Sequence, residues 1–336
     1  MTIPTTIKPL FAILLLAVAM TATAQTRRTT PGIVVTGSGS TIRAMGTFSG
    51  VPERGTEYAQ AVNRYQEVFG HRATVYCMVI PTAIEMYGDS LSAAWTKPQQ
   101  PAIEHIYSQL LPEVKAINVR DTLMAHRDEP ICLRTDHHWA PLGGYYAART
   151  FAEVAGVPFK GLEEYDRHVV TGFVGTMARW SKDPKVGRYP EDFVYYTPRD
   201  TDYVTTAVTY TLDKSRRRVV SQRGPEEVNF FRTYKDGSGQ AYSTFMGGDS
   251  NNTRVRAFGP APRRLLILKD SYGNALPGYL FYSFEQVHVI DCRYFTGSIV
   301  NYVDSYGITD ILFANNISHA YTSATSKMYH QYLEQR

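Results

Sequence analysis

Apolar positions along the chain alternate between helix-like and strand-like patterns. Residues 55–69 repeat apolar side chains at helical spacing, and residues 73–81 form a short, almost wholly apolar run typical of a strand covered on both faces. Similar patterns predict helices at about 102–111, near Leu123, at 143–155, from about 274 and at 298–306, and strands at 114–119, 130–134, 264–268, 286–290 and 310–314. This order predicts an α/β domain with a mostly parallel, doubly wound sheet and right-handed crossovers.

Residues 165–258 depart from that pattern. Short alternating segments at 192–196, 203–212 and 217–220 are separated by turns rich in Gly, Pro and charged residues. We interpret this region as a β-rich insertion that forms a cap or a substrate-facing lobe. It would interrupt a single domain that spans residues 55–336.

The N-terminal 24 residues have the organisation of a signal peptide. Lys8 precedes an apolar run at residues 10–20, and the small residues at 21–24 match an A-x-A cleavage site. Cleavage would release a periplasmic or extracellular protein that begins at Gln25, whereas an uncleaved membrane anchor is the alternative. Residues 25–54 are rich in Thr, Gly, Ser and Arg with weak periodicity, which predicts a linker or an arm that orders on docking.

Charge and cysteine content narrow the classes of partner and site. The chain has 336 residues and a formal net charge of +4. So small an excess, with no basic run, argues against nucleic acid as a partner. Cys77, Cys132 and Cys292 are spaced too widely for a zinc motif and lie in or beside apolar runs, so we expect buried side chains. An exported protein can form disulfides, and their state stays open.

Asp136 and His138 are the first candidate catalytic residues. In an extended segment, residues two apart point the same way, so Asp136 and His138 are expected on one face and His137 on the other. A carboxylate beside an imidazole fixes its tautomer and stabilises the imidazolium that forms when it takes a proton. His138 is therefore a candidate general base. The alternative is a structural histidine pair that caps a helix.

Ser271 is the candidate nucleophile. It follows the apolar run at 264–268 and falls in a strand-to-helix turn, where backbone N–H groups can hold an oxyanion. A serine hydroxyl needs an adjacent base, which His138 would supply. The alternative is that Ser271 only caps the helix. Gly-Asp-Ser sequences at 88–90 and 248–250 resemble a lipolytic motif, but neither directly follows an apolar strand.

Metal binding is the other use of an Asp-His-His cluster. One family of two-metal phosphoesterases has this motif together with Asp-rich motifs on earlier strands. The earlier strand at 73–81 contains no Asp. We therefore predict no metal and no cofactor at this site.

The segments around these residues resemble the DHHW protein family of bacterial envelopes. The resemblance extends from about residue 55 to 320 and rests on the segments at 135–139 (TDHHW), 143–145, 267–274, 290–294 and 309–313. This family is similar to the SGNH-hydrolase-like domains of alginate O-acetyltransferases. The resemblance therefore implies a three-layer, flavodoxin-like sheet.

The same resemblance implies roles for individual residues. Asp136 and His138 correspond to an Asp-x-His motif and Ser271 to the nucleophile, whereas Lys269 stands where the relatives have Gly, so the oxyanion site stays open. His137 and Trp139 are expected beside this triad. Candidates for the second oxyanion donor and for substrate contacts are Tyr272, Asn274, Asp249, Asn251, Arg293 and Asn315.

Two hypotheses of function follow. The first is hydrolysis or transfer of acyl esters on an envelope or extracellular polysaccharide, through an acyl group on Ser271. A transferase would also need an acetyl donor, and a membrane-bound O-acyltransferase is the expected partner. The second hypothesis is a glycan-binding or assembly component whose triad is vestigial.

Overall fold

The structure is a computed structural model. It describes residues 26–199, 202–215, 218–249, 251–257 and 259–335. The predicted signal peptide at residues 1–24 lies outside the described residues. Across the described ranges, no helix has both the length and the apolar character that a membrane span requires.

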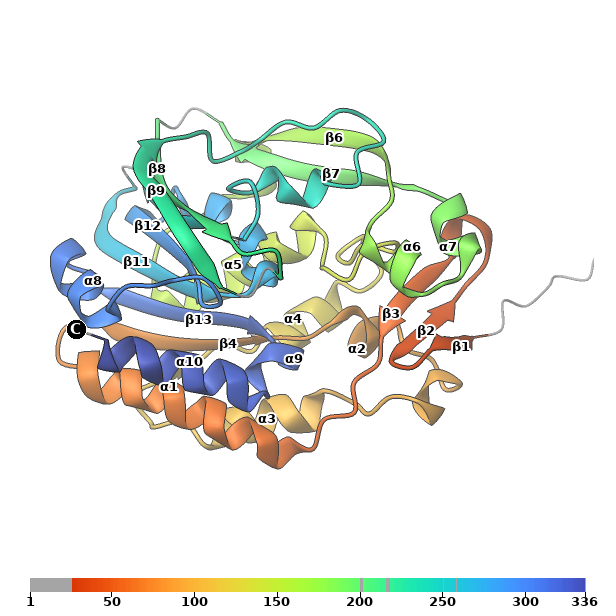
Figure 1. Cartoon of the computed structure of the whole chain (residues 1–336), viewed down its shortest axis with the longest axis horizontal. Helices are drawn as coiled ribbons and strands as arrows, with labels where there is room; N and C mark the ends of the chain where they lie inside the picture. Colours follow the sequence, from red (N-terminus) through yellow and green to blue (C-terminus); the bar gives the residue numbers. More distant parts are fainter. Residues whose placement is uncertain (1–25, 200–201, 216–217, 250, 258, 336) are drawn as a thin grey trace, which may run out of the picture.

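A large twisted sheet forms the centre of the molecule (Figure 1). Its strands, in spatial order, are β5 (Lys115–Ala116), β4 (Thr74–Ile80), β13 (Asp310–Asn316), β11 (Ala261–Lys269), β12 (Phe284–Asp291), β10 (Asn251–Arg256), β8 (Val204–Leu212) and β9 (Val219–Glu227). The strands from β5 to β12 pair in parallel, and β10, β8 and β9 extend the sheet by antiparallel pairing. The predicted α/β fold with a mostly parallel sheet is confirmed.

Helices pack on both faces of this sheet. The side chains of β4 alternate between two cores, with Val75 and Cys77 in one and Tyr76 and Met78 in the other. The first core includes residues of α1 (Thr56–Phe69), α3 (Gln100–Ser108), α8 (Ile299–Tyr306) and α10 (Ser323–Glu334). The second includes residues of α2 (Ala83–Tyr87), α4 (Val119–Ala125) and α5 (Pro141–Ala155). Because β4, β11 and β13 are apolar on both faces, the sequence shows continuous apolar runs there.

Residues 25–54, expected as a linker or arm, contain a small antiparallel sheet. Its strands are β1 (Arg27–Thr30), β2 (Ile33–Thr36) and β3 (Arg43–Gly46). Val35 and Ile42 pack against Met177 and Val186, in α6 (Thr176–Trp180) and α7 (Pro184–Arg188). Strands of four residues are too short to show a clear alternation, which explains the weak periodicity.

The β-rich region at 165–258 does not form a separate lobe. Strands β6 (Tyr165–Phe173) and β7 (Glu191–Pro198) pair as a two-stranded sheet, whereas β8, β9 and β10 continue the central sheet. Figure 1 shows β6 and β7 at the top of the molecule, and α6 and α7 near the N-terminal strands β1, β2 and β3.

Two predicted elements are wrong. Residues 130–134 form no strand but a folded loop, in which Cys132 and Trp139 make an isolated bridge. The apolarity of this segment reflects burial of Ile131 and Leu133 in the core. Instead of a helix from about 274 there are two short 3-10 turns, Ser271–Ala275 and Pro277–Leu280, because Pro277 interrupts the helical hydrogen bonds.

Candidate active site

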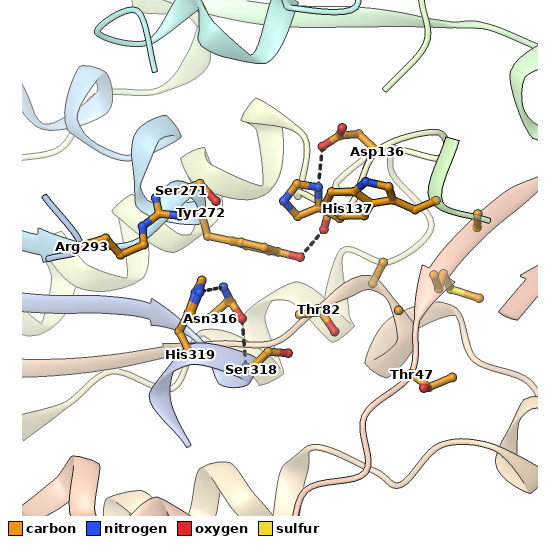
Figure 2. Close-up of a pocket in the computed structure, with 15 residues that line it drawn as sticks. Thr47, Thr82, Asp136, His137, Ser271, Tyr272, Arg293, Asn316, Ser318 and His319 are labelled. Atoms are coloured by element: carbon orange, nitrogen blue, oxygen red, sulfur yellow. Dashed lines mark hydrogen bonds and ion pairs between the residues drawn. The ribbon is translucent and has the colours of Figure 1, made fainter. Parts of the chain in front are cut away.

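Ser271 lies directly after β11, where the strand passes into the first 3-10 turn (Figure 2). The capping function at this turn belongs to Asp270, whose carboxylate accepts the Tyr272 N–H at 2.9 Å. Ser271 is the first residue of the turn, so its own N–H has no carbonyl acceptor within the turn. The hydroxyl of Ser271 is therefore available for another partner.

The structure brings Ser271 together with both residues of the Asp-x-His segment. The Ser271 hydroxyl lies 2.7 Å from His138 Nε2, and His138 Nδ1 lies 2.6 Å from Asp136 Oδ1. All three side chains are buried. The segment is a turn and not an extended strand. Asp136 Oδ1 also accepts the His138 N–H at 3.1 Å, and this local turn directs the two side chains towards each other.

The second carboxylate oxygen of Asp136 is held by the start of α6. It accepts hydrogen bonds from the Thr176 N–H at 2.8 Å and from the Thr176 hydroxyl at 3.0 Å. Burial alone would raise the pKa of Asp136. The hydrogen bond from His138, the charges of His138 and His137, and the Thr176 N–H together hold that pKa well below its usual range. Asp136 is therefore ionised, as an orienting carboxylate must be.

Contrary to the prediction, the His137 side chain does not point away from the site. Its ring packs between His138, at 3.7 Å between centroids, and Trp180, at 4.9 Å. Tyr242 stacks on the other face of His138 at 3.9 Å. Burial and the neighbouring His138 lower the pKa of His137 to about 3, against the opposing effect of Asp136. His137 is therefore a neutral ring that supports His138.

Trp139 and Tyr272 connect the histidine loop to the serine turn. The Trp139 indole donates to the Tyr272 carbonyl at 2.8 Å. The Tyr272 hydroxyl donates to the His137 carbonyl (Figure 2). The Tyr242 hydroxyl also donates to the Ser271 carbonyl at 3.0 Å. These bonds fix the position of the His138 loop relative to Ser271.

A buried network of charges lies behind the serine turn. Lys269 Nζ is 2.8 Å from Asp291, and Arg293 contacts the same carboxylate through Nε at 2.8 Å and Nη2 at 2.6 Å. Arg293 also lies 3.0 Å from Asp249, which accepts from Asn274 Nδ2 at 2.8 Å. Burial would raise the pKa of Asp249, but Lys269, Arg293 and Asn274 hold it well below its usual range. The charges of Lys269 and Asp249 are therefore paired within this network.

Two of the predicted amide donors have other partners, and the third faces away from the cavity. Asn274 binds Asp249, and Asn251 Nδ2 donates to the Met246 carbonyl at 2.6 Å. Asn315 lies on the opposite face of the sheet, where its Oδ1 accepts hydroxyl hydrogens from Tyr58 and Tyr329, both at 2.7 Å. The next residue, Asn316, lines the site instead.

A cavity of about 360 Å³ opens beside Ser271. Among the predicted residues, Asp136, His137, Tyr272 and Arg293 line it. Its other walls come from elements that the sequence analysis missed: β3 with the following Thr47, the start of α2, Trp180, and α9 (Ile317–Ala320) with Asn316 before it. The one feature of the sequence that indicates this wall is the polar pair Asn315 and Asn316 at the end of a strand.

Asp136, His137 and His138 are also the one group in the described ranges whose ligand atoms lie close enough to hold a metal, within 4.8 Å of one another. However, His138 uses Nδ1 for Asp136 and Nε2 for Ser271, and His137 Nδ1 lies 2.8 Å from the Thr176 hydroxyl. Three of the four ring nitrogens are thus committed to hydrogen bonds, and those of His138 suit proton transfer better than metal binding.

The two decoy serines do not share this geometry. Ser90 is exposed in a turn that is not part of the cavity wall. Ser250 lies outside the described residues, although the neighbouring Asp249 belongs to the buried charge network.

Comparison with known proteins gives a consistent assignment. A family model described as DHHW protein matches residues 17–290. The crystal structure of a DHHW family protein from Eubacterium siraeum is 33% identical, with 90% of this chain and 96% of that chain covered and a TM-score of 0.79. Bacillus cereus PatB1 with a sulfonyl adduct is 17% identical, with 90% and 99% covered and a TM-score of 0.66, and therefore shares the fold.

A third solved structure, the O-acetyltransferase domain of Pseudomonas putida AlgJ, is 12% identical, with 91% of this chain and 100% of that chain covered and a TM-score of 0.48. None of the curated proteins matches the sequence. The family model and the Eubacterium siraeum structure are sufficient: the chain belongs to the DHHW protein family.

Proposed function

We propose that the protein is a serine acyl-ester hydrolase or O-acetyltransferase, with Ser271 as nucleophile, His138 as general base and Asp136 as the carboxylate that orients His138. The observation that supports this most directly is the pair of distances at His138, 2.7 Å from Nε2 to the Ser271 hydroxyl and 2.6 Å from Nδ1 to Asp136. This geometry at the wall of a cavity suits acyl transfer.

In the proposed reaction, Ser271 Oγ attacks the carbonyl carbon of an ester while its proton moves to His138 Nε2. The oxyanion accepts a hydrogen bond from the Ser271 N–H, and Asp136 stabilises the imidazolium. The intermediate then collapses, the alcohol leaves with the proton from His138, and the acyl group stays on Ser271. Water or a sugar hydroxyl then attacks the acyl carbon and gives its proton to His138. The bond between the acyl carbon and Ser271 Oγ breaks, and Oγ takes that proton from His138.

Asn316 replaces Asn315 as the candidate for the second oxyanion donor. It lines the cavity at the end of β13, the strand next to β11. Its Nδ2 group has two hydrogens, of which one is used at 3.0 Å on Asp270. The same nitrogen lies 3.0 Å from His319 Nδ1, which cannot accept the second hydrogen while it donates its own to Asp270.

The proposed substrate is an O-acylated polysaccharide outside the cytoplasm. The predicted signal peptide supports export, and the half-exposed Trp180, with Thr47, Thr82 and Ser318 on the cavity wall, supports a sugar ligand. A membrane-bound O-acyltransferase remains the proposed acetyl donor. As part of the same proposal, the fold is a three-layer, SGNH-hydrolase-like fold.

The test is release of p-nitrophenol from p-nitrophenyl acetate by the wild type and by Ser271→Ala. We expect the variant to lose roughly a hundredfold or more of the turnover, since a site without its nucleophile keeps only residual rate. Ser90→Ala is the matched control, because it removes a serine of the decoy sequence outside the cavity. Equal rates in the wild type and Ser271→Ala would refute the proposal. Activity that survives in Ser271→Ala and disappears with EDTA would favour metal catalysis instead.

A further inference from the structure

A second His–Asp pair faces the same cavity as Ser271. His319, in α9, lies with Nδ1 2.9 Å from Asp270 Oδ2, and both His319 and Ser271 line the cavity. Asp270 is fully buried, whereas the His319 side chain is 39% exposed. Because Asp270 directly precedes Ser271, the position of His319 is fixed relative to the nucleophile.

The triad does not use this pair, and the fold does not require it. The Asp270 carboxylate already accepts the Tyr272 N–H at 2.9 Å, the Asn316 N–H at 2.8 Å and Asn316 Nδ2 at 3.0 Å. These donors satisfy a buried carboxylate without an imidazole. The Nε2 atom of His319 makes no hydrogen bond to any described residue. In the view of Figure 2, His319 and Asn316 lie below Tyr272, on the side away from Asp136.

The surroundings of His319 engage Nδ1 and leave Nε2 for another partner. Burial lowers the pKa of His319, but the hydrogen bond and charge of Asp270 outweigh it and raise the pKa above its usual value. Of the other charged groups that face it, Arg293 lowers the pKa and Asp291 raises it. With Nδ1 bound to Asp270, Nε2 is the atom that can bind an oxygen in the cavity.

We propose that His319, oriented by Asp270, is an acceptor-binding residue that makes a hydrogen bond through Nε2 with a hydroxyl of the acceptor sugar. This inference rests on the proposed function. It names a sugar because the rest of that wall offers the hydroxyls of Thr47 and Thr82 and the aromatic face of Trp180, which is 43% exposed. These groups suit a ligand with an apolar ring face and several neutral hydroxyls.

The role of His319 is to hold the sugar and not to move a proton. While His319 binds one hydroxyl, a neighbouring hydroxyl attacks the acyl carbon and gives its proton to His138. The bond between the acyl carbon and Ser271 Oγ breaks, and Oγ takes that proton from His138. The acyl group has then moved from serine to sugar, and His319 has neither gained nor lost a proton.

Binding tests the inference without any turnover. In the Ser271→Ala background, cellopentaose, chitopentaose and a pentauronate are titrated calorimetrically into protein with and without His319→Ala. We expect the substitution to weaken binding of the best pentasaccharide by about tenfold, as for the loss of one hydrogen bond. His71→Ala, an exposed histidine outside the cavity wall, is the matched control. No binding of any pentasaccharide, or equal affinity with and without His319, would overturn the inference.

A second measurement separates acceptor binding from support of the nucleophile. With p-nitrophenyl acetate as donor and the best pentasaccharide as acceptor, His319→Ala should lower the ratio of transfer to hydrolysis by about tenfold, while the initial burst of p-nitrophenol changes by less than about twofold. A parallel fall of the burst would mean that His319 acts through Asp270 on the serine turn, which overturns the inference. A wild type that releases p-nitrophenol no faster than Ser271→Ala would refute the proposed function, whereas the binding experiment would still decide the role of His319.

Discussion

Gly175 offers a way to disturb the triad without replacing any of its members. The residue precedes α6 with φ −88° and ψ −170°, a backbone conformation that alanine adopts freely. A Cβ atom at this position would lie 2.3 Å from Asp136 Cβ and 2.5 Å from Asp136 Oδ2, closer than the 3.0 Å that real Cβ atoms respect. In Gly175→Ala, either the Asp136 carboxylate or the start of α6 must move.

The contact distances give the size of the effect. An added methyl in a packed region costs about 1–3 kcal/mol, and misplacement of a catalytic group by about 1 Å costs roughly a hundredfold in rate. Either movement also weakens the 2.8 Å bond from the Thr176 N–H that helps to hold Asp136. We therefore expect kcat/KM for p-nitrophenyl acetate to fall by about a hundredfold, with a fall of a few degrees in Tm.

Gly187→Ala is the matched control for this prediction. It adds the same methyl nearby, in α7, but its Cβ would approach Ala178 Cβ at 3.5 Å, an ordinary van der Waals contact. Esterase assays and thermal unfolding of both variants measure the difference. If Gly175→Ala kept the rate of Gly187→Ala, the position of the Asp136 carboxylate would not govern the activity, and the mechanism built on it would fail.

Three further predictions concern pH, buried charge and thiols. The folded-state pKa of Asp136 lies below its unfolded value of about 3.9, so the ionised carboxylate stabilises the folded protein fully above about pH 4, and this stabilisation is lost as pH falls further. The difference in unfolding free energy between wild type and Asp136→Asn should therefore shrink from about pH 7 to about pH 3. A constant difference would contradict this. Asp291→Ala removes the 2.8 Å partner of the buried Lys269 amine and should cost about 3–5 kcal/mol in urea unfolding, so an unchanged midpoint would contradict the pairing. Cys77, Cys132 and Cys292 are all free and buried, and burial raises the pKa of Cys132 and Cys292 to about 12, so dithionitrobenzoate should label no thiol in the native protein and three in denaturant; fewer than three in denaturant would show a disulfide.

The sequence predicted the residues of the candidate triad because each of the two segments has a local signal. Ser271 follows a long apolar strand, and Asp136 and His138 are so close in the chain that a short turn joins them. The extended segment expected for Asp136 and His138 was wrong, since these residues lie in a turn and the preceding residues 130–134 form no strand. An apolar run reports burial, and burial in a loop between helices looks the same as burial in a sheet.

The walls of the cavity could not be predicted in the same way. Strand β3 has four residues, and α9 has four, so neither has a detectable period. The choice between Asn315 and Asn316 depends on the register of β13, because a shift of one residue moves a side chain to the other face. His319 gave no signal because its partner, Asp270, is 49 residues away in the chain.

The N-terminal sheet packs on the two short helices α6 and α7, and α6 in turn holds the Asp136 carboxylate. A random-mutagenesis screen for loss of esterase activity should therefore recover substitutions at residues 33–46 together with those in the triad. Such alleles lie in the N-terminal part of the chain, after the predicted signal peptide, and would be mistaken for export defects. Measuring the amount of protein outside the cell beside its specific activity would separate a chain that is not delivered from one that is delivered inactive.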